Sequence, residues 1–199
     1  KSINNNWLNV FLVPNPILAI ITRIIIDNYN LKKENILIVS LRDTSLEIFD
    51  HNYLIIQRKK YDKYLEKIFF DSPSGRRVLR KINSTHKNFL LFSGWAYREV
   101  NWLITKHNCK GHIHVEEGQS AYASYTEYKF DKLDLFERIR MNISNRIVPT
   151  AHIPHLEGTG LAFRDDAEAY IGIDERSFSL MPSSKRYILK DFKEVKKYY

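Results

Sequence analysis

The stretch VFLVPNP, residues 10–16, is an apolar run that ends in a turn. A helix is expected over 17–29, which is apolar on nearly every side, because Pro16 fits the first turn of a helix at little cost. Residues 35–40 (NILIVS) are then expected to form a second apolar strand. A strand, a helix and a strand within about 30 residues predict a βαβ unit with parallel strands and a right-handed crossover.

The same alternation continues along the rest of the chain. Further strands are predicted at 53–56, 89–92, 112–115 and 169–173, helices at 61–70, 75–82, 97–107, 131–144 and 189–199, and a long loop at 146–164. Apolar strands that alternate with helices are typical of a Rossmann-like, doubly wound α/β sheet with mostly parallel strands. We therefore expect one such domain over residues 1–185, followed by a helix or linker over 186–199.

Composition and charge narrow the class of protein. Hydrophobic residues make up 44% of the chain and charged residues 27%, which fits a globular domain. The single cysteine, Cys109, excludes an internal disulfide and fits a reducing compartment. The net charge of +8 favours anionic partners such as a membrane surface, but no nucleic-acid-binding motif accompanies it. The apolar run 17–26 is shorter than the roughly 20 residues that span a bilayer, so we expect a cytoplasmic or peripheral inner-membrane protein.

The sequence HVEEGQSAY, residues 114–122, begins in a predicted strand and continues past its end. In open α/β sheets, ligands bind beyond the carboxyl ends of the strands. Neighbouring side chains of a strand point to opposite faces, so one of Glu116 and Glu117 can face a substrate while the other braces the loop. A carboxylate facing the substrate suits a general base. The plain alternative is that both are solvated loop acids.

Other polar or flexible residues follow the predicted strands as well. Ser93 and Gly94 come at the end of one strand, and the turn at Asn15 offers backbone N–H groups that can bind a phosphate. His112 and His114 would share a strand face with Glu116, yet no further donors are evident, so we expect no metal site.

Three segments of the chain resemble one family of enzymes. Residues 10–18 (VFLVPNPIL) resemble the first strand and turn of bacterial lipooligosaccharide sialyltransferases and the related capsule polysialyltransferases. Residues 114–122 look like the acidic-acidic-glycine motif of that family, and 169–178 is similar to the segment that closes its first domain. The motifs are short, but they occur in order over most of the chain.

The resemblance implies the N-terminal half of a GT-B glycosyltransferase, whose active site lies between two Rossmann-like domains. It implies a metal-independent, inverting transfer of sialic acid from CMP-sialic acid to a cell-surface glycan acceptor. Glu117 or Glu116 would be the base, with Glu117 favoured because it lies next to the glycine. The remaining residues of the motif would contact substrate: Gly118, Gln119, Ser120 and Tyr122. The family's His-Pro motif is absent, so we expect the donor-binding domain to lie outside this chain and the fragment to be inactive alone.

Two other functions remain open at this point. One keeps the fold and changes the donor, which makes the protein a transferase for another activated sugar in capsule or lipopolysaccharide synthesis. The other is a non-catalytic, basic α/β binding module. Paired carboxylates at a strand end favour an enzyme, because a binding module has no need for them.

Overall fold

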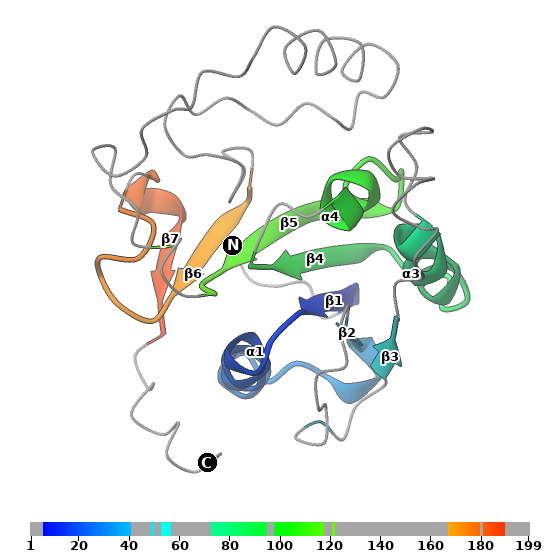
Figure 1. The fold of residues 1–199 in the computed structure, drawn as a ribbon, viewed down its shortest axis with the longest axis horizontal. Helices are drawn as coiled ribbons and strands as arrows, with labels where there is room; N and C mark the ends of the chain where they lie inside the picture. The colour runs from blue at the N-terminus through cyan, green and yellow to red at the C-terminus, as the bar shows by residue number, and fades with distance from the viewer. Residues whose placement is uncertain are drawn as a thin grey trace, which may run out of the picture.

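A computed structural model describes residues 6–40, 49, 53–56, 73–94, 98–117, 121, 167–179 and 181–189. These residues form a seven-stranded sheet in which every pair of neighbouring strands is parallel (Figure 1). The strands are β1 (Leu8–Val13), β2 (Ile36–Ser40), β3 (Tyr53–Ile55), β4 (Phe89–Ser93), β5 (Cys109–Val115), β6 (Ala169–Gly172) and β7 (Arg186–Ile188). The prediction of a Rossmann-like α/β sheet is therefore confirmed.

Helices cover both faces of this sheet. One face packs against α1 (Pro16–Asn28), and the other packs against α3 (Pro73–Asn83) and α4 (Arg98–Leu103). In Figure 1, α1 lies on one side of the row of strands, and α3 and α4 lie on the other. Short 3-10 turns, Lys33–Asn35 and Ser183–Lys185, lead into β2 and β7.

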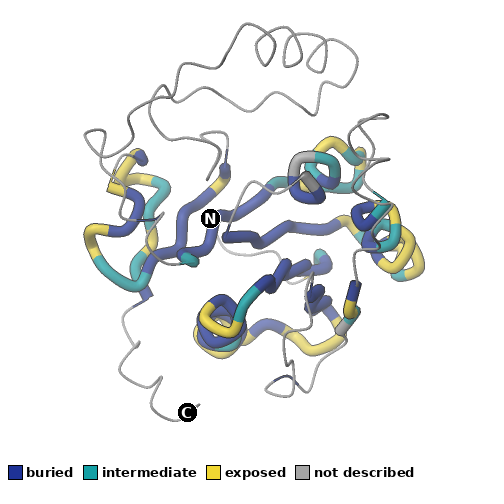
Figure 2. The backbone as a smooth tube through the Cα atoms, in the orientation of Figure 1, coloured by how far each residue is buried: buried dark blue, intermediate teal, exposed yellow. Residues whose placement is uncertain are grey.

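The core is divided between the two faces by the alternation of side chains along each strand. In β1, Phe11 and Val13 pack with α1, while Val10 and Leu12 pack with α3 and α4. Every residue of β1, β2, β4 and β6 is buried, as Figure 2 shows for the backbone. Strands covered on both faces have to be apolar throughout, which is why they form continuous hydrophobic runs in the sequence.

The strand order places a reversal of topology beside β1. The order is β3-β2-β1-β4-β5-β6-β7. Strands β2 and β3 therefore lie on one side of β1, and β4 to β7, which come later in the chain, lie on its other side. The carboxyl ends of β1, β4 and β5 lie level, because Leu12 pairs with Ser93 and Ser93 pairs with His114. A crevice at such a reversal is where open α/β sheets bind their ligands.

Two predicted boundaries are wrong. The helix predicted over 97–107 ends at Leu103, after which Thr105 donates its hydroxyl hydrogen to the carbonyl of Trp102 at 2.8 Å in a series of turns. The sequence predicts a helix or linker over 186–199, but Arg186–Ile188 is the edge strand β7, paired with β6. The predicted helices at 61–70 and 131–144, the loop at 146–164 and residues 190–199 lie outside the described residues.

The helices of the described segments are too short or too polar to cross a membrane.

Candidate active site

Glu116 and Glu117 follow β5 directly, and their side chains contact opposite neighbours. Glu116 contacts the turn between β6 and β7, and Glu117 contacts the turn between β1 and α1. The alternation of strand side chains explains this divergence, because residues next to each other face opposite sides of the sheet. The two carboxylates therefore lie in different surroundings and are suited to different tasks.

The Glu116 carboxylate braces the turn after β6. Its Oε2 atom accepts hydrogen bonds from the backbone N–H of Ile173 at 2.8 Å and from the hydroxyl of Ser177 at 2.6 Å. Only 2% of Glu116 is exposed. The packing at Gly172 is close, since a Cβ atom built there would lie 2.8 Å from the Ser177 hydroxyl oxygen. Glu116 is thus a structural link between β5 and the β6–β7 turn.

A second carboxylate stabilises the same turn from outside. The Arg176 side chain and backbone N–H both donate hydrogen bonds to Asp174, and these bonds lower the pKa of Asp174 to about 2. The turn therefore has an internal ion pair on its exposed side and the Glu116 bonds on its buried side.

Glu117 crosses the end of β4 and reaches the start of α1. Its Oε1 atom accepts a hydrogen bond from Nδ2 of Asn15 at 2.9 Å. The side chain lies against Gly94, where an added Cβ atom would come within 2.7 Å of the Glu117 Cβ atom. Residues from the ends of β1, β4 and β5 thus meet where the topology reverses.

Asn15 is also the N-cap of α1. Its Oδ1 atom accepts a hydrogen bond from the backbone N–H of Leu18 at 2.8 Å, and Pro16 occupies the first turn. Pro16 has no N–H, and the negative charge next to this helix end belongs to Glu117. This arrangement disfavours the expectation that the turn at Asn15 binds a phosphate, because a second anion would lie beside the Glu117 carboxylate.

The other predicted site residues either face away from Glu117 or lie outside the residues that the structure describes. Ser93 is buried, and strand alternation puts its side chain on the face that α3 and α4 cover, away from Glu117. Gly118, Gln119, Ser120 and Tyr122 lie outside the described residues. Sequence reasoning missed Ser177, which is 61 residues from Glu116 and carries no local pattern that reveals this contact.

The two histidines of β5 pack within an aromatic cluster. His114 stacks on Tyr170 with ring centroids 5.7 Å apart, and the rings of His112 and His114 form a T-shaped pair with centroids 5.2 Å apart. Tyr170 in turn contacts Phe178. Among the described residues, no group of three or more His, Cys, Asp or Glu side chains is arranged to hold a metal ion.

Cys109, at the start of β5, is expected to react slowly with thiol reagents. Burial raises the pKa of this thiol to about 11, although a hydrogen bond with the backbone of Gly111 and the charge of Lys110 act in the other direction. At pH 8 the native chain should therefore react with a thiolate-specific reagent about 100-fold more slowly than the unfolded chain. Equal rates of reaction in the two states would contradict this environment for Cys109.

Comparisons of the chain with models of known protein families and with curated proteins give no match.

Proposed function

We propose that this chain is the acceptor-side half of a sialyltransferase-like, metal-independent, inverting glycosyltransferase in which Glu117 is the general base. The observation that carries the proposal is the position of the Glu117 carboxylate, which Asn15 and Gly94 hold at the topological reversal of the sheet. The choice of substrates rests on the three short motifs that resemble sialyltransferases. The resemblance implies CMP-sialic acid as the donor and a cell-surface glycan as the acceptor.

In the proposed reaction, Glu117 takes the proton from an acceptor hydroxyl while that oxygen attacks the anomeric carbon of sialic acid. The bond between this carbon and the phosphate oxygen breaks, and CMP leaves with the bonding electrons. Attack from the side opposite the leaving group inverts the anomeric centre. Glu116 is the weaker candidate for the base, because its Oε2 atom already accepts two hydrogen bonds and its side chain is buried.

The negative charge of Glu117 beside the start of α1 supports a role in binding the acceptor. In dinucleotide-binding domains of related architecture, the N-terminus of the first helix faces a phosphate. Here a carboxylate of the protein itself lies there, next to a proline that lacks an N–H group. A neutral sugar hydroxyl is a better partner for this position than a nucleotide phosphate, which agrees with a donor bound mainly by another domain.

The test uses the full-length natural protein with radiolabelled nucleotide sugars. Transfer from CMP-sialic acid to a galactose-terminated or sialic-acid-terminated acceptor supports the proposal. Transfer only from a different nucleotide sugar would instead support the alternative transferase of capsule or lipopolysaccharide synthesis, because the same base serves either donor. Absence of transfer from every donor would overturn the enzymatic proposal.

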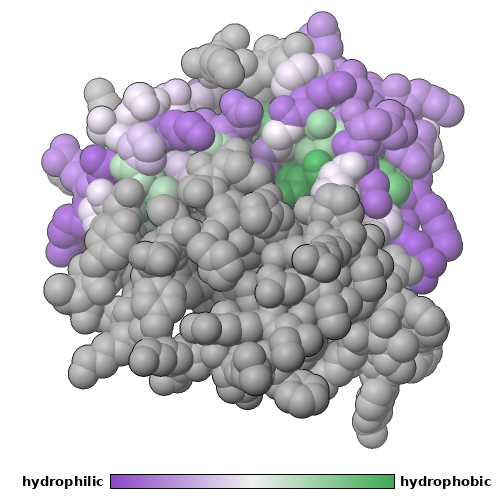
Figure 3. All heavy atoms as spheres, turned by 90° about the horizontal axis from the view of Figure 1, so that it is seen from above, coloured by the Kyte–Doolittle hydropathy of each residue, from purple (hydrophilic) through white to green (hydrophobic). Residues whose placement is uncertain are grey.

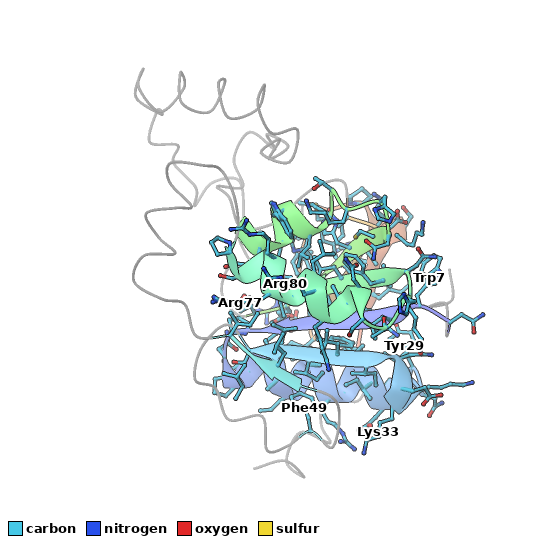
Figure 4. The ribbon with its side chains drawn as sticks, turned by 90° about the vertical axis from the view of Figure 1, so that its right-hand side faces the viewer. Trp7, Tyr29, Lys33, Phe49, Arg77 and Arg80 are labelled. Atoms are coloured by element: carbon cyan, nitrogen blue, oxygen red, sulfur yellow. The ribbon has the colours of Figure 1, made fainter. Side chains whose placement is uncertain are left out.

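A second candidate, a binding module for anionic membranes, is supported by the charge around α3 and α4. Within 73–94 and 98–110 the sole acidic residue is Glu99, which is fully buried. The exposed basic residues of these segments are Arg76, Arg80, Lys81 and Lys110. In Figure 3 hydrophilic side chains cover both flanks of the described surface, and those on the right lie on the side where α3 lies in Figure 1. Figure 4 labels Arg77 and Arg80 on this helix. This basic side of the sheet lies opposite α1.

Replacing Arg76 and Arg80 together with Ala should weaken binding to acidic phospholipid vesicles at low salt by roughly 30-fold, since each basic residue near such a surface contributes about 1 kcal/mol. The matched control replaces Lys32 and Lys33, which are exposed at the other side of the molecule, and should bind as the parent does. An equal loss of vesicle binding in both variants would show that binding depends on the net charge of the protein and not on a defined basic surface. Failure of the parent to bind would remove this candidate altogether.

A further inference from the structure

The side-chain amide of Asn15 is used at both ends. Its Oδ1 atom accepts from the backbone N–H of Leu18 at 2.8 Å and so caps α1, while its Nδ2 atom donates to Oε1 of Glu117 at 2.9 Å. Turning the amide over would exchange donor and acceptor and lose both bonds. The cap and the carboxylate therefore fix the orientation of one group together.

Capping alone does not explain an asparagine at this position. Ser and Asp cap helices about as well as Asn does. Asp, however, has no hydrogen to donate to Glu117 and would place a second negative charge against it. The Ser hydroxyl can both accept and donate, but it is a single atom on a shorter side chain and cannot occupy the positions of both Oδ1 and Nδ2 of Asn15. Among these capping residues, Asn alone satisfies both the helix end and the carboxylate.

The backbone around Asn15 limits the directions in which its side chain can point. Pro16 follows it, and the residue before a proline is disfavoured in the helical region. Asn15 accordingly has φ −151° and ψ 163°, which is extended backbone. The sequence Pro14-Asn15-Pro16 thus holds the amide in place before α1 begins.

Glu117 is confined from its other side by β4. A Cβ atom at Gly94 would lie 2.7 Å from the Cβ atom and 3.1 Å from the Cδ atom of Glu117, so the side chain lies directly over the end of that strand. From there the carboxylate reaches the N-terminus of α1, whose partial positive charge favours an anion.

We propose that Asn15 is a positioning residue that orients the Glu117 carboxylate and ties it to the N-terminus of α1. The inference rests on the proposed function, in which Glu117 takes the proton from the acceptor. Asn15 itself need not touch substrate. This role differs from the expectation drawn from the sequence, in which the turn at Asn15 binds the substrate through its backbone.

Three variants of the full-length enzyme separate positioning from capping. Asn15→Ser keeps the cap and should leave Tm close to that of the parent, whereas Asn15→Ala should lower Tm by about 2 to 4 °C. Asn15→Asp also keeps the cap, but repulsion between its carboxylate and that of Glu117 should lower Tm at neutral pH. Turnover should follow a different order. It should fall roughly 10-fold in the Ser and Ala variants and roughly 100-fold in the Asp variant, with KM for the acceptor changed far less. A purely structural role predicts instead that turnover follows Tm, so that the Ser variant keeps the turnover of the parent.

Ser177→Ala is the matched control, since it removes a hydrogen bond to the neighbouring Glu116 and leaves the Asn15 contact intact. Its turnover should stay near that of the parent. If turnover falls as far in this variant as in Asn15→Ser, the loss comes from general loosening of the strand ends, and the inference is overturned.

A crystal structure of the Asn15→Ser enzyme provides a result that does not depend on activity. The Glu117 carboxylate should leave its place while α1 still begins at Pro16. A Glu117 side chain in its parental conformation would show that Asn15 does not position it. This result decides the role of Asn15 even if the acidic pair proves to have no part in the reaction, so failure of the inference and failure of the proposed function are distinguishable.

Discussion

If Glu117 is the base of the proposed transfer, replacing it with Gln is expected to lower the turnover of the full-length protein by roughly 10²- to 10⁴-fold, because Gln cannot take the proton from the acceptor hydroxyl. Folding should be nearly unaffected, since Gln keeps the shape of the side chain and its oxygen can still accept from Asn15. Donor affinity should also change little, because the family resemblance implies that the donor binds mainly to a second domain. The measurement is the initial rate of transfer from CMP-sialic acid, with Tm recorded for each variant.

Glu116→Gln is the matched control, because it neutralises the adjacent carboxylate of the same motif. The Gln oxygen can still accept from Ile173 and Ser177, but both buried bonds lose their charged acceptor, so this variant should lose about 1–3 kcal/mol of the free energy of unfolding. Its loss of turnover should be smaller than that of Glu117→Gln. Near-parental turnover in both variants would remove the acidic pair from the mechanism and leave it as a structural link between strand ends.

Much of the sheet could be predicted because its central strands are buried on both faces. The strands predicted at 35–40, 89–92 and 112–115 are continuous hydrophobic runs or adjoin one. The last two lie within parallel strands of the structure, and the first begins one residue before β2. Sequence reasoning misses β7 because a three-residue edge strand, Arg-Tyr-Ile, is half exposed and has no such run. It misplaces the end of α4 because Trp102 and Ile104 continue the apolar pattern of the helix, although the backbone turns after Leu103.

The site could be predicted in part, from the position of the strand ends. Parallel strands bring their carboxyl ends to one edge, so residues after β1, β4 and β5 are expected to lie near one another. The sequence does not reveal which glutamate faces Asn15, because that depends on the face of the sheet against which α1 packs. Nor does it reveal the bond from Ser177 to Glu116, which joins segments 61 residues apart. Contacts of this kind arise from the three-dimensional arrangement and leave no local pattern.

Replacing Gly94 with Ala is expected to impair both stability and turnover. The added Cβ atom would lie 2.7 Å from the Cβ atom of Glu117, which is attached to the backbone that follows β5 and cannot swing aside as the end of a side chain can. Either the ends of β4 and β5 separate or Glu117 is displaced. Overpacking of this kind typically costs about 1–3 kcal/mol, and a displaced base should lower turnover by roughly 10²-fold.

A double-mutant cycle with Glu117→Ala shows whether this contact is the cause. In the Glu117→Ala background the Cδ and carboxylate atoms that crowd Gly94 are gone, although the Cβ atom stays. The destabilisation caused by Gly94→Ala should therefore shrink by about 0.5–3 kcal/mol relative to the parent, which is the range expected for residues in contact. Chemical denaturation of the four proteins measures this difference. If Gly94→Ala costs the same in both backgrounds, the strain comes from the Cβ atom of residue 117, which both backgrounds keep, or from elsewhere at the end of β4, and the carboxylate end of Glu117 is not held against Gly94.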